Sequence, residues 1–160
     1  MQVSNPRCIR EEREEKMIFF GFLCLLSYCL ADQAADNTAT LTRLSNDGNE
    51  QIAFDSDSFK KATQGPRNYA LFVILTALNP QFNCLPCKLL HKEFQDLQYS
   101  VSKSEEKGRI FVGFLDYSAN TQDIFASMNL QAVPHLRIYY PNAGPHAKDT
   151  DYEVVTLSTQ

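Results

Sequence analysis

Two cysteines separated by two residues are the side chains of this sequence best suited to do chemistry. They stand in the run Cys84-Leu85-Pro86-Cys87. This spacing lets both sulfur atoms meet on one turn of a helix, so the pair can form and break a disulfide. The thiolate is the nucleophile in such motifs, where the pKa of the thiol falls well below about 8.5. The pair therefore predicts thiol–disulfide exchange.

The residues after the pair predict which sulfur attacks. Apolar residues recur after Cys87 at intervals of three and four, which predicts a helix of about five turns that ends near residues 107–108. At the start of a helix, free N–H groups and the helix dipole stabilise a thiolate. We therefore expect Cys84, at the exposed tip, to attack and Cys87 to resolve. The inward stripe of this helix comprises Cys87, Leu90, Phe94, Leu97 and Val101.

Two other interpretations of the pair stay open. One is a zinc half-site with Cys84, Cys87, His91 and His135 as ligands, but a structural zinc site normally has a second CxxC or HxxxH pair, which this sequence lacks. The other is an inert disulfide, which would close a very short loop and stabilise the fold little. We favour redox chemistry because the motif opens a helix after a strand, and we expect no metal and no cofactor.

The segments that must position the cysteines alternate between strands and helices. Apolar runs rich in β-branched and aromatic residues predict strands at 69–78, 110–115 and 135–140, the first buried on both faces. A short helix is predicted over 121–128, and a strand over 152–157 would pair antiparallel with the strand before it. This order predicts an α/β fold, a mixed sheet with helices on both faces.

The region before the first of these strands carries weaker signals. Residues 32–40 are polar, and 41–44 indicate the start of a strand before a turn at 46–49. Residues 55–58, Asp-Ser-Asp-Ser, offer N-cap side chains for a short helix that Gly-Pro at 65–66 ends.

Residues 1–31 resemble a secretory signal peptide rather than part of the fold. Residues 1–16 carry four basic and four acidic side chains, and 17–30 carry 14 residues without charge. Cleavage after Ala31 would put small residues at the positions that signal peptidase reads. The apolar stretch is short for a membrane span, which needs about 20 residues. A buried core helix and an uncleaved signal anchor are the alternatives, the first disfavoured because the stretch has no polar face.

Composition narrows the classes of function. The chain of 160 residues is 44% hydrophobic and 21% charged, which excludes a disordered or fibrous protein. Its net charge of -4, without blocks of Lys or Arg, makes it a poor binder of nucleic acid. After removal of residues 1–31, Cys84 and Cys87 are its only cysteines.

Two long stretches resemble a known family. The order strand, CxxC, helix, strand, helix, Val-Pro, hairpin resembles the thioredoxin fold, which implies a thioredoxin-like mixed sheet over residues 32–160. More narrowly, the sequence resembles the lumenal domain of the oligosaccharyltransferase oxidoreductase subunits, the subunit 3/6 family, whose animal members are also named magnesium transporter protein. The signals are PRNYALFVILTALNPQFNCLPC, the pair Asp116-Tyr117, and D-[IV]-F-x-x-[ML]-N at 123–129. They lie within about residues 41–157.

The resemblance implies a function in the lumen of the endoplasmic reticulum. Family members form mixed disulfides with nascent, cysteine-containing polypeptides and hold them beside the glycosylating subunit. Carried over by position, Cys84 attacks, Cys87 resolves, and Pro134 is a cis-proline beside them. An extended peptide would bind in the groove beside them, along Val133 and Pro134, whereas His135, a lone histidine at a strand start, is more often a surface residue than part of such a groove. The implied partners are such polypeptides and other oligosaccharyltransferase subunits. A free disulfide isomerase-like enzyme and a peptide-holding domain without redox chemistry are the alternatives.

The sequence also departs from these patterns. Asn83 stands where thioredoxins carry Trp, and the strand at 69–78 has no carboxylate to move protons for Cys87, which favours long-lived mixed disulfides. The family continues with a final helix and four membrane spans, so membrane attachment would come only from segments missing here. We expect apolar area beside the last strand to be exposed for the same reason.

Cleavage of the leader is testable. We expect protein purified from the lumen to begin at Asp32. The apolar stretch is followed by small residues directly before Asp32, which is the pattern that signal peptidase recognises. Intact-mass analysis measures this directly. A mass that includes residues 17–30 would contradict cleavage and favour an anchor.

Overall fold

The structure, a computed structural model, describes residues 34–46, 50–142, 148 and 152–155. The predicted leader lies outside these ranges. In chain order the described elements are a helix over 34–44, β1 (Ile52–Phe54), α2 (Ser56–Thr63), β2 (Ala70–Thr76), the short 3-10 helix η1 (Pro80–Phe82), α3 (Leu85–Ser102), β3 (Ile110–Asp116), α4 (Gln122–Ser127), β4 (His135–Tyr139) and β5 (Tyr152–Val155). None of the described helices is long and apolar enough to span a membrane.

The five strands form one mixed sheet in the order β1-β3-β2-β4-β5. β2 occupies the centre, parallel to β3 on one side and antiparallel to β4 on the other. β5 pairs antiparallel with β4. The predicted α/β class, the central place of the first apolar run and the antiparallel pairing of the last described strand are therefore confirmed.

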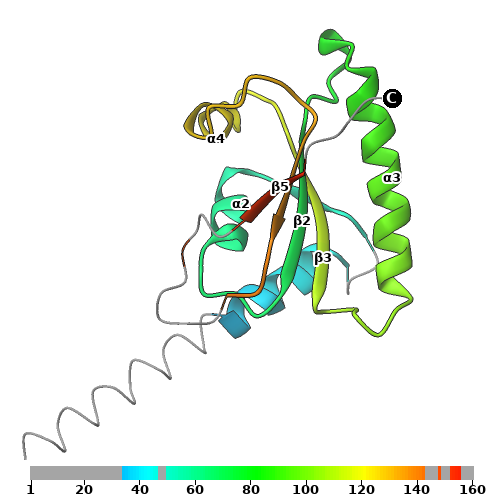
Figure 1. The fold of residues 1–160 in the computed structure, drawn as a ribbon, viewed down its shortest axis with the longest axis vertical. Coiled ribbons are helices and arrows are strands. Elements are labelled where there is room, and N and C mark those ends of the chain that lie inside the picture. Colours follow the sequence, from blue (N-terminus) through cyan, green and yellow to red (C-terminus); the bar gives the residue numbers. More distant parts are fainter. Residues whose placement is uncertain (1–33, 47–49, 143–147, 149–151, 156–160) are drawn as a thin grey trace, which may run out of the picture.

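Helices cover both faces of the sheet, as Figure 1 shows, with α3 on one side and α2 and α4 on the other. Alternation along β2 explains this arrangement, because successive side chains of a strand point to opposite faces. Leu71, Val73 and Leu75 enter the core beneath α2 and α4, whereas Ile74 packs with Phe94 of α3. An apolar run without polar alternation therefore needs a helix on each face.

The N-terminal part of the domain differs from the sequence prediction. The strand expected at 41–44 is wrong, since these residues end a helix over 34–44. Ala34, Leu41 and Ser45 are buried at intervals of seven and four residues, which is the spacing of one helix face. β1 was not predicted at all, because three residues are too few to show a period of two.

The long helix also ends earlier than predicted. α3 stops at Ser102 rather than near residues 107–108. Leu97, expected on the inward stripe, is 37% exposed, and Gln98 is buried in its place. Residues spaced alternately by three and four repeat every 3.5 residues, whereas the helix has 3.6 residues per turn. Over about three turns the predicted stripe therefore rotates away from the sheet, and the next residue is buried instead.

The signals around α2 are confirmed. Asp55 caps the helix, its carboxylate accepting a hydrogen bond from the Ser58 backbone N–H at 2.7 Å, while Ser58 Oγ accepts from the Asp55 backbone N–H. Hydrogen bonds from Ser58 hold the pKa of Asp55 below its usual value. Gln64 ends the helix before Gly65-Pro66, as predicted.

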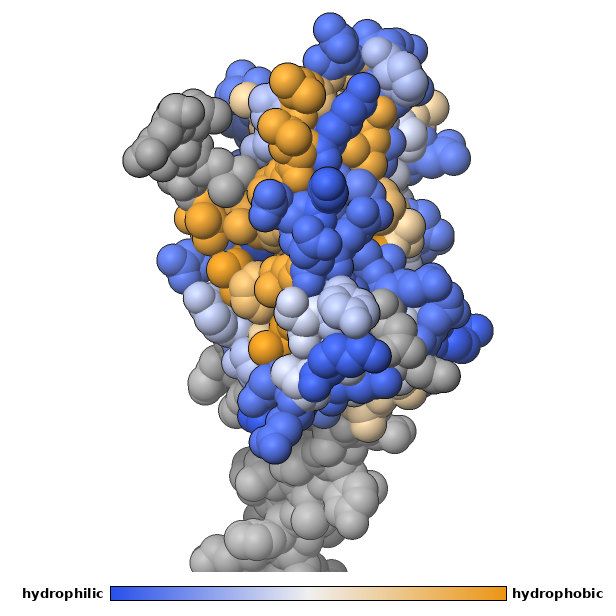
Figure 2. Space-filling model, turned by 90° about the vertical axis from the view of Figure 1, so that its right-hand side faces the viewer, coloured by the Kyte–Doolittle hydropathy of each residue, from blue (hydrophilic) through white to orange (hydrophobic). Residues whose placement is uncertain are grey.

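Apolar side chains stay partly exposed near the last described strand. Phe72 and Val155 are half-buried on the α3 face, and Val154 is 46% exposed. Seen from the α3 side, Figure 2 shows apolar surface beside and above a polar band. The expectation that apolar area is exposed beside this strand stays a prediction, because residues 156–160 lie outside the described ranges.

Gly113 in β3 is a point where the fold tolerates no side chain. A Cβ there would overlap the Phe54 ring and lie 2.8 Å from the Ile52 carbonyl oxygen. We expect Gly113→Ala to lower the free energy of unfolding by about 1–3 kcal/mol, the usual cost of overpacking. Urea unfolding of the full chain measures this.

Gly108→Ala is the matched control. At Gly108 a Cβ would meet nothing within 4 Å, and the φ of +82° imposes backbone strain alone. An unchanged or raised urea midpoint for Gly113→Ala would show that β1 and β3 do not approach as closely as the structure places them.

Candidate redox site

A short turn after β2 sets the position and direction of α3. After Thr76 the chain forms η1, capped by Asn79, whose side chain accepts a hydrogen bond from the Gln81 backbone N–H at 3.1 Å. Asn83 then adopts the left-handed conformation at φ 47°, which Asn tolerates better than most residues. This turn, which the sequence did not predict, separates β2 from the cysteine motif.

Cys84 and Cys87 open α3, as the sequence predicted. Cys84 is the N-cap, and its Sγ accepts a hydrogen bond from the Cys87 backbone N–H at 3.2 Å. The two residues are joined by a disulfide, with their Cα atoms 5.3 Å apart. Cys84 is partly exposed, whereas Cys87 is 0% exposed. Pro86 lies in the first turn, where the missing N–H has no partner to lose.

Polar contacts join the end of β2 to the end of β3 beneath this motif. Asp116 Oδ1 accepts a hydrogen bond from the Leu78 backbone N–H at 2.6 Å, and the Tyr117 backbone N–H donates to the Thr76 carbonyl at 2.8 Å. Thr121 Oγ1 donates to the Asp116 carbonyl at 2.6 Å. These bonds fix the start of α3 relative to the sheet.

Aromatic rings link the same edge to α4. The Tyr117 ring lies 5.6 Å from Phe82 of η1 and 5.2 Å from Phe125 of α4, edge-on to both. Such edge-to-face pairs contribute about 0.5–1.5 kcal/mol beyond their burial. Tyr117 therefore connects the turn before Cys84 with the helix that precedes Val133 and Pro134.

Apolar side chains are exposed around the disulfide. Phe82, Leu85 and Leu89 are 41%, 63% and 59% exposed. Leu85 lies between the two cysteines, and Leu89 is one turn further along α3. Their exposure is costly in water, so this end of α3 is suited to contact another apolar chain.

Val133 and Pro134 lie at the same edge of the sheet as the end of β2. His135 pairs with Leu75, so Pro134, one residue earlier, stands beside the last residues of β2. The Val133–Pro134 peptide bond is cis, and both residues are half-buried. The structure thus places these two residues and the cysteines at one edge, since α3 starts from that end of β2.

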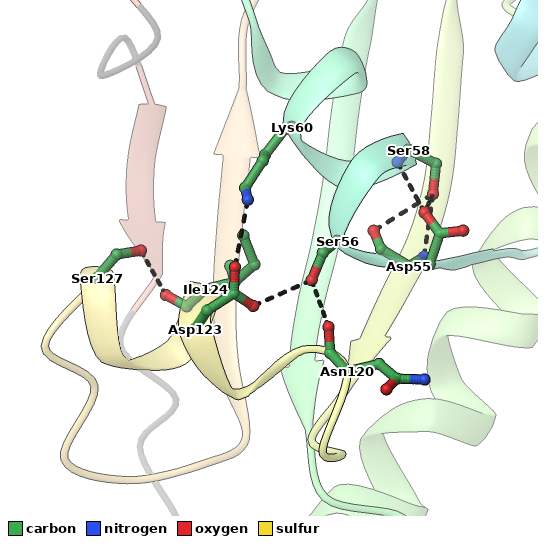
Figure 3. Close-up of polar contacts among 8 residues, drawn as sticks. All are labelled: Asp55, Ser56, Ser58, Lys60, Asn120, Asp123, Ile124 and Ser127. Atoms are coloured by element: carbon green, nitrogen blue, oxygen red, sulfur yellow. Dashed lines mark hydrogen bonds and ion pairs between the residues drawn. The ribbon is translucent and has the colours of Figure 1, made fainter.

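Contacts between α2 and α4 hold the segment that leads to Pro134. Lys60 Nζ lies 3.2 Å from Asp123 Oδ2, and Ser56 Oγ donates to the Asn120 carbonyl at 2.7 Å (Figure 3). The hydrogen bond from Lys60 lowers the pKa of Asp123. Both charged groups are exposed, so this contact orients α4 more than it stabilises the fold.

Two histidines flank the site, and burial lowers the pKa of each. His91 lies one turn after Cys87 on α3, with its ring 4.6 Å from the Phe114 ring, and the charge of Asp116 partly opposes the effect of its burial. His135 begins β4, where the positive charge of Arg137 lowers its pKa further. Within the described ranges, no three His, Cys, Asp or Glu side chains are grouped to hold a metal.

Several residues that build the site were not singled out for that role by the sequence. Asp116 and Tyr117 stood out only as part of a family pattern, and Phe82 not at all. The available signal was position, because a polar and an aromatic residue directly after an apolar strand lie at the carboxyl edge of a sheet. The sequence pattern suggests His91 only as a zinc ligand.

Comparison with known proteins assigns the family. The sequence pattern of the OST3/OST6 family, described as a transporter family, matches residues 39–160. The chain belongs to the OST3/OST6 family. The resemblance inferred from the motifs is thereby confirmed.

Relatives in this family include a protein of Mus musculus, the dolichyl-diphosphooligosaccharide–protein glycosyltransferase subunit MAGT1, which is 32% identical over 105 residues. The proteins of the same name from Homo sapiens and Gallus gallus are 31% and 30% identical over the same length. The match covers 64% of this chain and 31% of each relative. The chain therefore spans under a third of the length of these OST3/OST6 relatives.

Solved structures with the same architecture confirm the fold class. Thioredoxin F from spinach chloroplast, in its long form, superposes with a TM-score of 0.51 at 14% identity, covering 72% of this chain and 81% of that one. Full-length ERdj5 gives a TM-score of 0.53 at 15% identity, covering 68% of this chain and 14% of that one. This OST3/OST6 member therefore has a thioredoxin-like fold.

The unequal exposure of the two cysteines predicts unequal reactivity. After reduction of the full chain, we expect iodoacetamide to label Cys84 at least about tenfold faster than Cys87, because Cys84 is partly exposed at a helix N-terminus and Cys87 is covered. Peptide mass spectrometry resolves the two sites. In urea the two rates should converge. Faster labelling of Cys87 in the native state would contradict the arrangement.

Proposed function

We propose that this domain is a thiol–disulfide oxidoreductase module that captures cysteine-containing polypeptides through mixed disulfides. The observation that carries the proposal is the asymmetry of the pair at the start of α3. Cys84 is partly exposed, whereas Cys87, bonded to it through sulfur, is fully covered. A reversible capture reaction needs this division between an attacking and a resolving sulfur.

The chemistry runs in two exchanges. In the reduced pair, the Cys84 thiolate attacks a disulfide of the bound polypeptide, forms a mixed disulfide and releases one polypeptide thiolate. Cys87 then attacks Cys84, which restores the Cys84–Cys87 disulfide and releases the second polypeptide sulfur as a thiol. From the oxidised pair, a polypeptide thiolate attacks Cys84 and forms the same mixed disulfide while Cys87 leaves as the thiol. No metal or organic cofactor enters either exchange.

The edge around the pair supports binding of an extended peptide. The exposed apolar side chains of Phe82, Leu85 and Leu89 offer contact area next to Cys84. Val133, just before β4, would present its backbone groups to a peptide as a neighbouring strand does. Pro134 fixes that backbone at the edge where α3 begins.

The relatives support a setting for this chemistry. They are named as subunits of the dolichyl-diphosphooligosaccharide–protein glycosyltransferase. By extension, the domain would work in the endoplasmic reticulum, facing the lumen behind a signal peptide of residues 1–31, with other oligosaccharyltransferase subunits as partners. An oxidising lumen maintains the disulfide chemistry that the cysteine pair requires. Capture of nascent chains there would assist their N-glycosylation.

A peptide-holding domain without redox chemistry is the second candidate. The exposed apolar residues Leu85 and Leu89 favour it, because they could bind unfolded polypeptide whether or not a sulfur reacts. The reduction potential of Cys84–Cys87 separates the candidates. A value near about -180 mV indicates an isomerase-like couple, whereas the absence of a reversible couple leaves only the binding domain.

Trapping of covalent adducts tests the capture reaction. We expect Cys87→Ser to accumulate disulfide adducts with cysteine-containing polypeptides, because the mixed disulfide at Cys84 can no longer be resolved from within the domain. Cys84→Ser should trap at least about tenfold less, since the remaining sulfur is covered. Non-reducing gels of full chains expressed at matched levels in the lumen measure both.

The variant lacking both cysteines sets the background of the trapping experiment. Equal adduct formation by the two single variants would assign no attacking role to Cys84. Adducts mainly in Cys84→Ser would reverse the two roles.

A further inference from the structure

An imidazole lies on the inner side of α3, one helical turn behind the covered cysteine. Cys87 and His91 are four residues apart on this helix, so their Cβ atoms are neighbours about 5–6 Å apart on one face. The His91 ring packs edge-on against Phe114 of β3, which holds it beneath the helix. Cys87 and His91 therefore lie on the same face of α3, one turn apart.

One nitrogen of this ring has no partner. His91 Nδ1 is buried and makes no hydrogen bond, while Nε2 lies 3.4 Å from the Gln95 side-chain amide. A buried polar atom without a partner costs free energy, so native proteins keep few of them, and often at functional sites. Packing alone would be served as well by an apolar ring at this position.

The surrounding charges suit a proton acceptor. Burial lowers the pKa of His91, so the ring is neutral near neutral pH and able to accept a proton. Asp116, at the end of β3, is held in place by the Leu78 backbone N–H, and its negative charge would stabilise the imidazolium once it forms. Beside these groups, β2 supplies no carboxylate.

A pocket connects His91 with solvent. It measures about 430 Å³ and opens between α3, β3 and the segment before β1. Glu50, an exposed residue, is the carboxylate in its lining. Its lining comprises Glu50, Gln51, His91, Gln95, Gln98 and Phe114. A proton received by His91 could leave by this path without crossing the apolar core.

We propose that His91 accepts the thiol proton of Cys87 when Cys87 resolves the mixed disulfide. The inference rests on the proposed capture chemistry and names the base of its second step. The S–H bond of Cys87 breaks and its proton passes to His91, while the sulfur bonds to Cys84. The bond between Cys84 and the polypeptide sulfur breaks, and that sulfur leaves as a thiolate. His91 then returns its proton to the thiolate or to water.

The test separates resolution from attack. The reduced full chain is mixed with a peptide disulfide, quenched in acid at short times, and analysed for the mixed disulfide by mass spectrometry. We expect His91→Ala to slow the decay of the mixed disulfide by about 10- to 100-fold near neutral pH, around the lower end of general acid–base effects. The deficit should shrink as pH rises, because hydroxide then ionises Cys87 directly. Attack by Cys84, measured in the Cys87→Ser background, should be unchanged.

Chemical rescue distinguishes proton transfer from a structural effect. Added imidazole should restore resolution in His91→Ala, where the deleted ring leaves room beside the pocket, and should not accelerate the wild type. Lys92→Ala, which removes an exposed side chain of α3 adjacent in sequence, is the matched control and should resolve at the wild-type rate.

The outcomes keep the two hypotheses apart. A wild-type rate and pH profile in His91→Ala, in a chain that still forms and resolves mixed disulfides, would overturn the role of His91 alone. A slow variant that imidazole does not rescue would also overturn it, since the effect would then be structural. A wild type that never forms a mixed disulfide would overturn the capture function itself.

Discussion

The placement of β2 between β3 and β4 is the constraint on which the site depends. β3 runs parallel to β2 and β4 runs antiparallel to it. The carboxyl ends of β2 and β3 therefore meet the amino end of β4 at one edge of the sheet. The turn to α3 and the loop to α4 begin at that edge, and the segment with the cis Val133–Pro134 bond enters β4 there. Residues that are 50 positions apart in sequence, Cys84 and Pro134, are brought there by strand pairing.

One helical turn places the two cysteines in different environments. Cys84 caps the helix outside its first turn and stays partly exposed, while Cys87 faces the sheet and is covered. The proposed chemistry makes two demands: a reactive sulfur must meet solvent and apolar polypeptide, and the covered cysteine must have a proton acceptor nearby. The exposed Leu85 and Leu89 serve the first demand. His91, half-buried on the inner side of α3 and acted on by the charge of Asp116, serves the second.

The main elements of this fold could be predicted because their signals are local or rest on strong periodicity. Long apolar runs gave β2, β3 and β4, and capping side chains gave α2. β1 and the helix over 34–44 could not be predicted. A strand of three residues is too short to show a period. A weakly apolar helix resembles a polar segment in sequence, and only the structure shows that Leu41 lies in the core. The shift of the buried face from Leu97 to Gln98 likewise depends on the true helical pitch against a particular sheet.

The sequence by itself determined which reactive side chains this protein has and how they are spaced. Residue type and a spacing of three place Cys84 and Cys87 on one helical turn, and the run of family motifs places Val133 and Pro134 before a strand. Only the tertiary structure decided which groups surround that chemistry. Asp116 meets Leu78, Tyr117 meets Phe82, and His91 packs on Phe114, through contacts between residues 23 to 38 positions apart. No local propensity encodes such contacts, because they exist only once β2 and β3 have paired and α3 has packed on them.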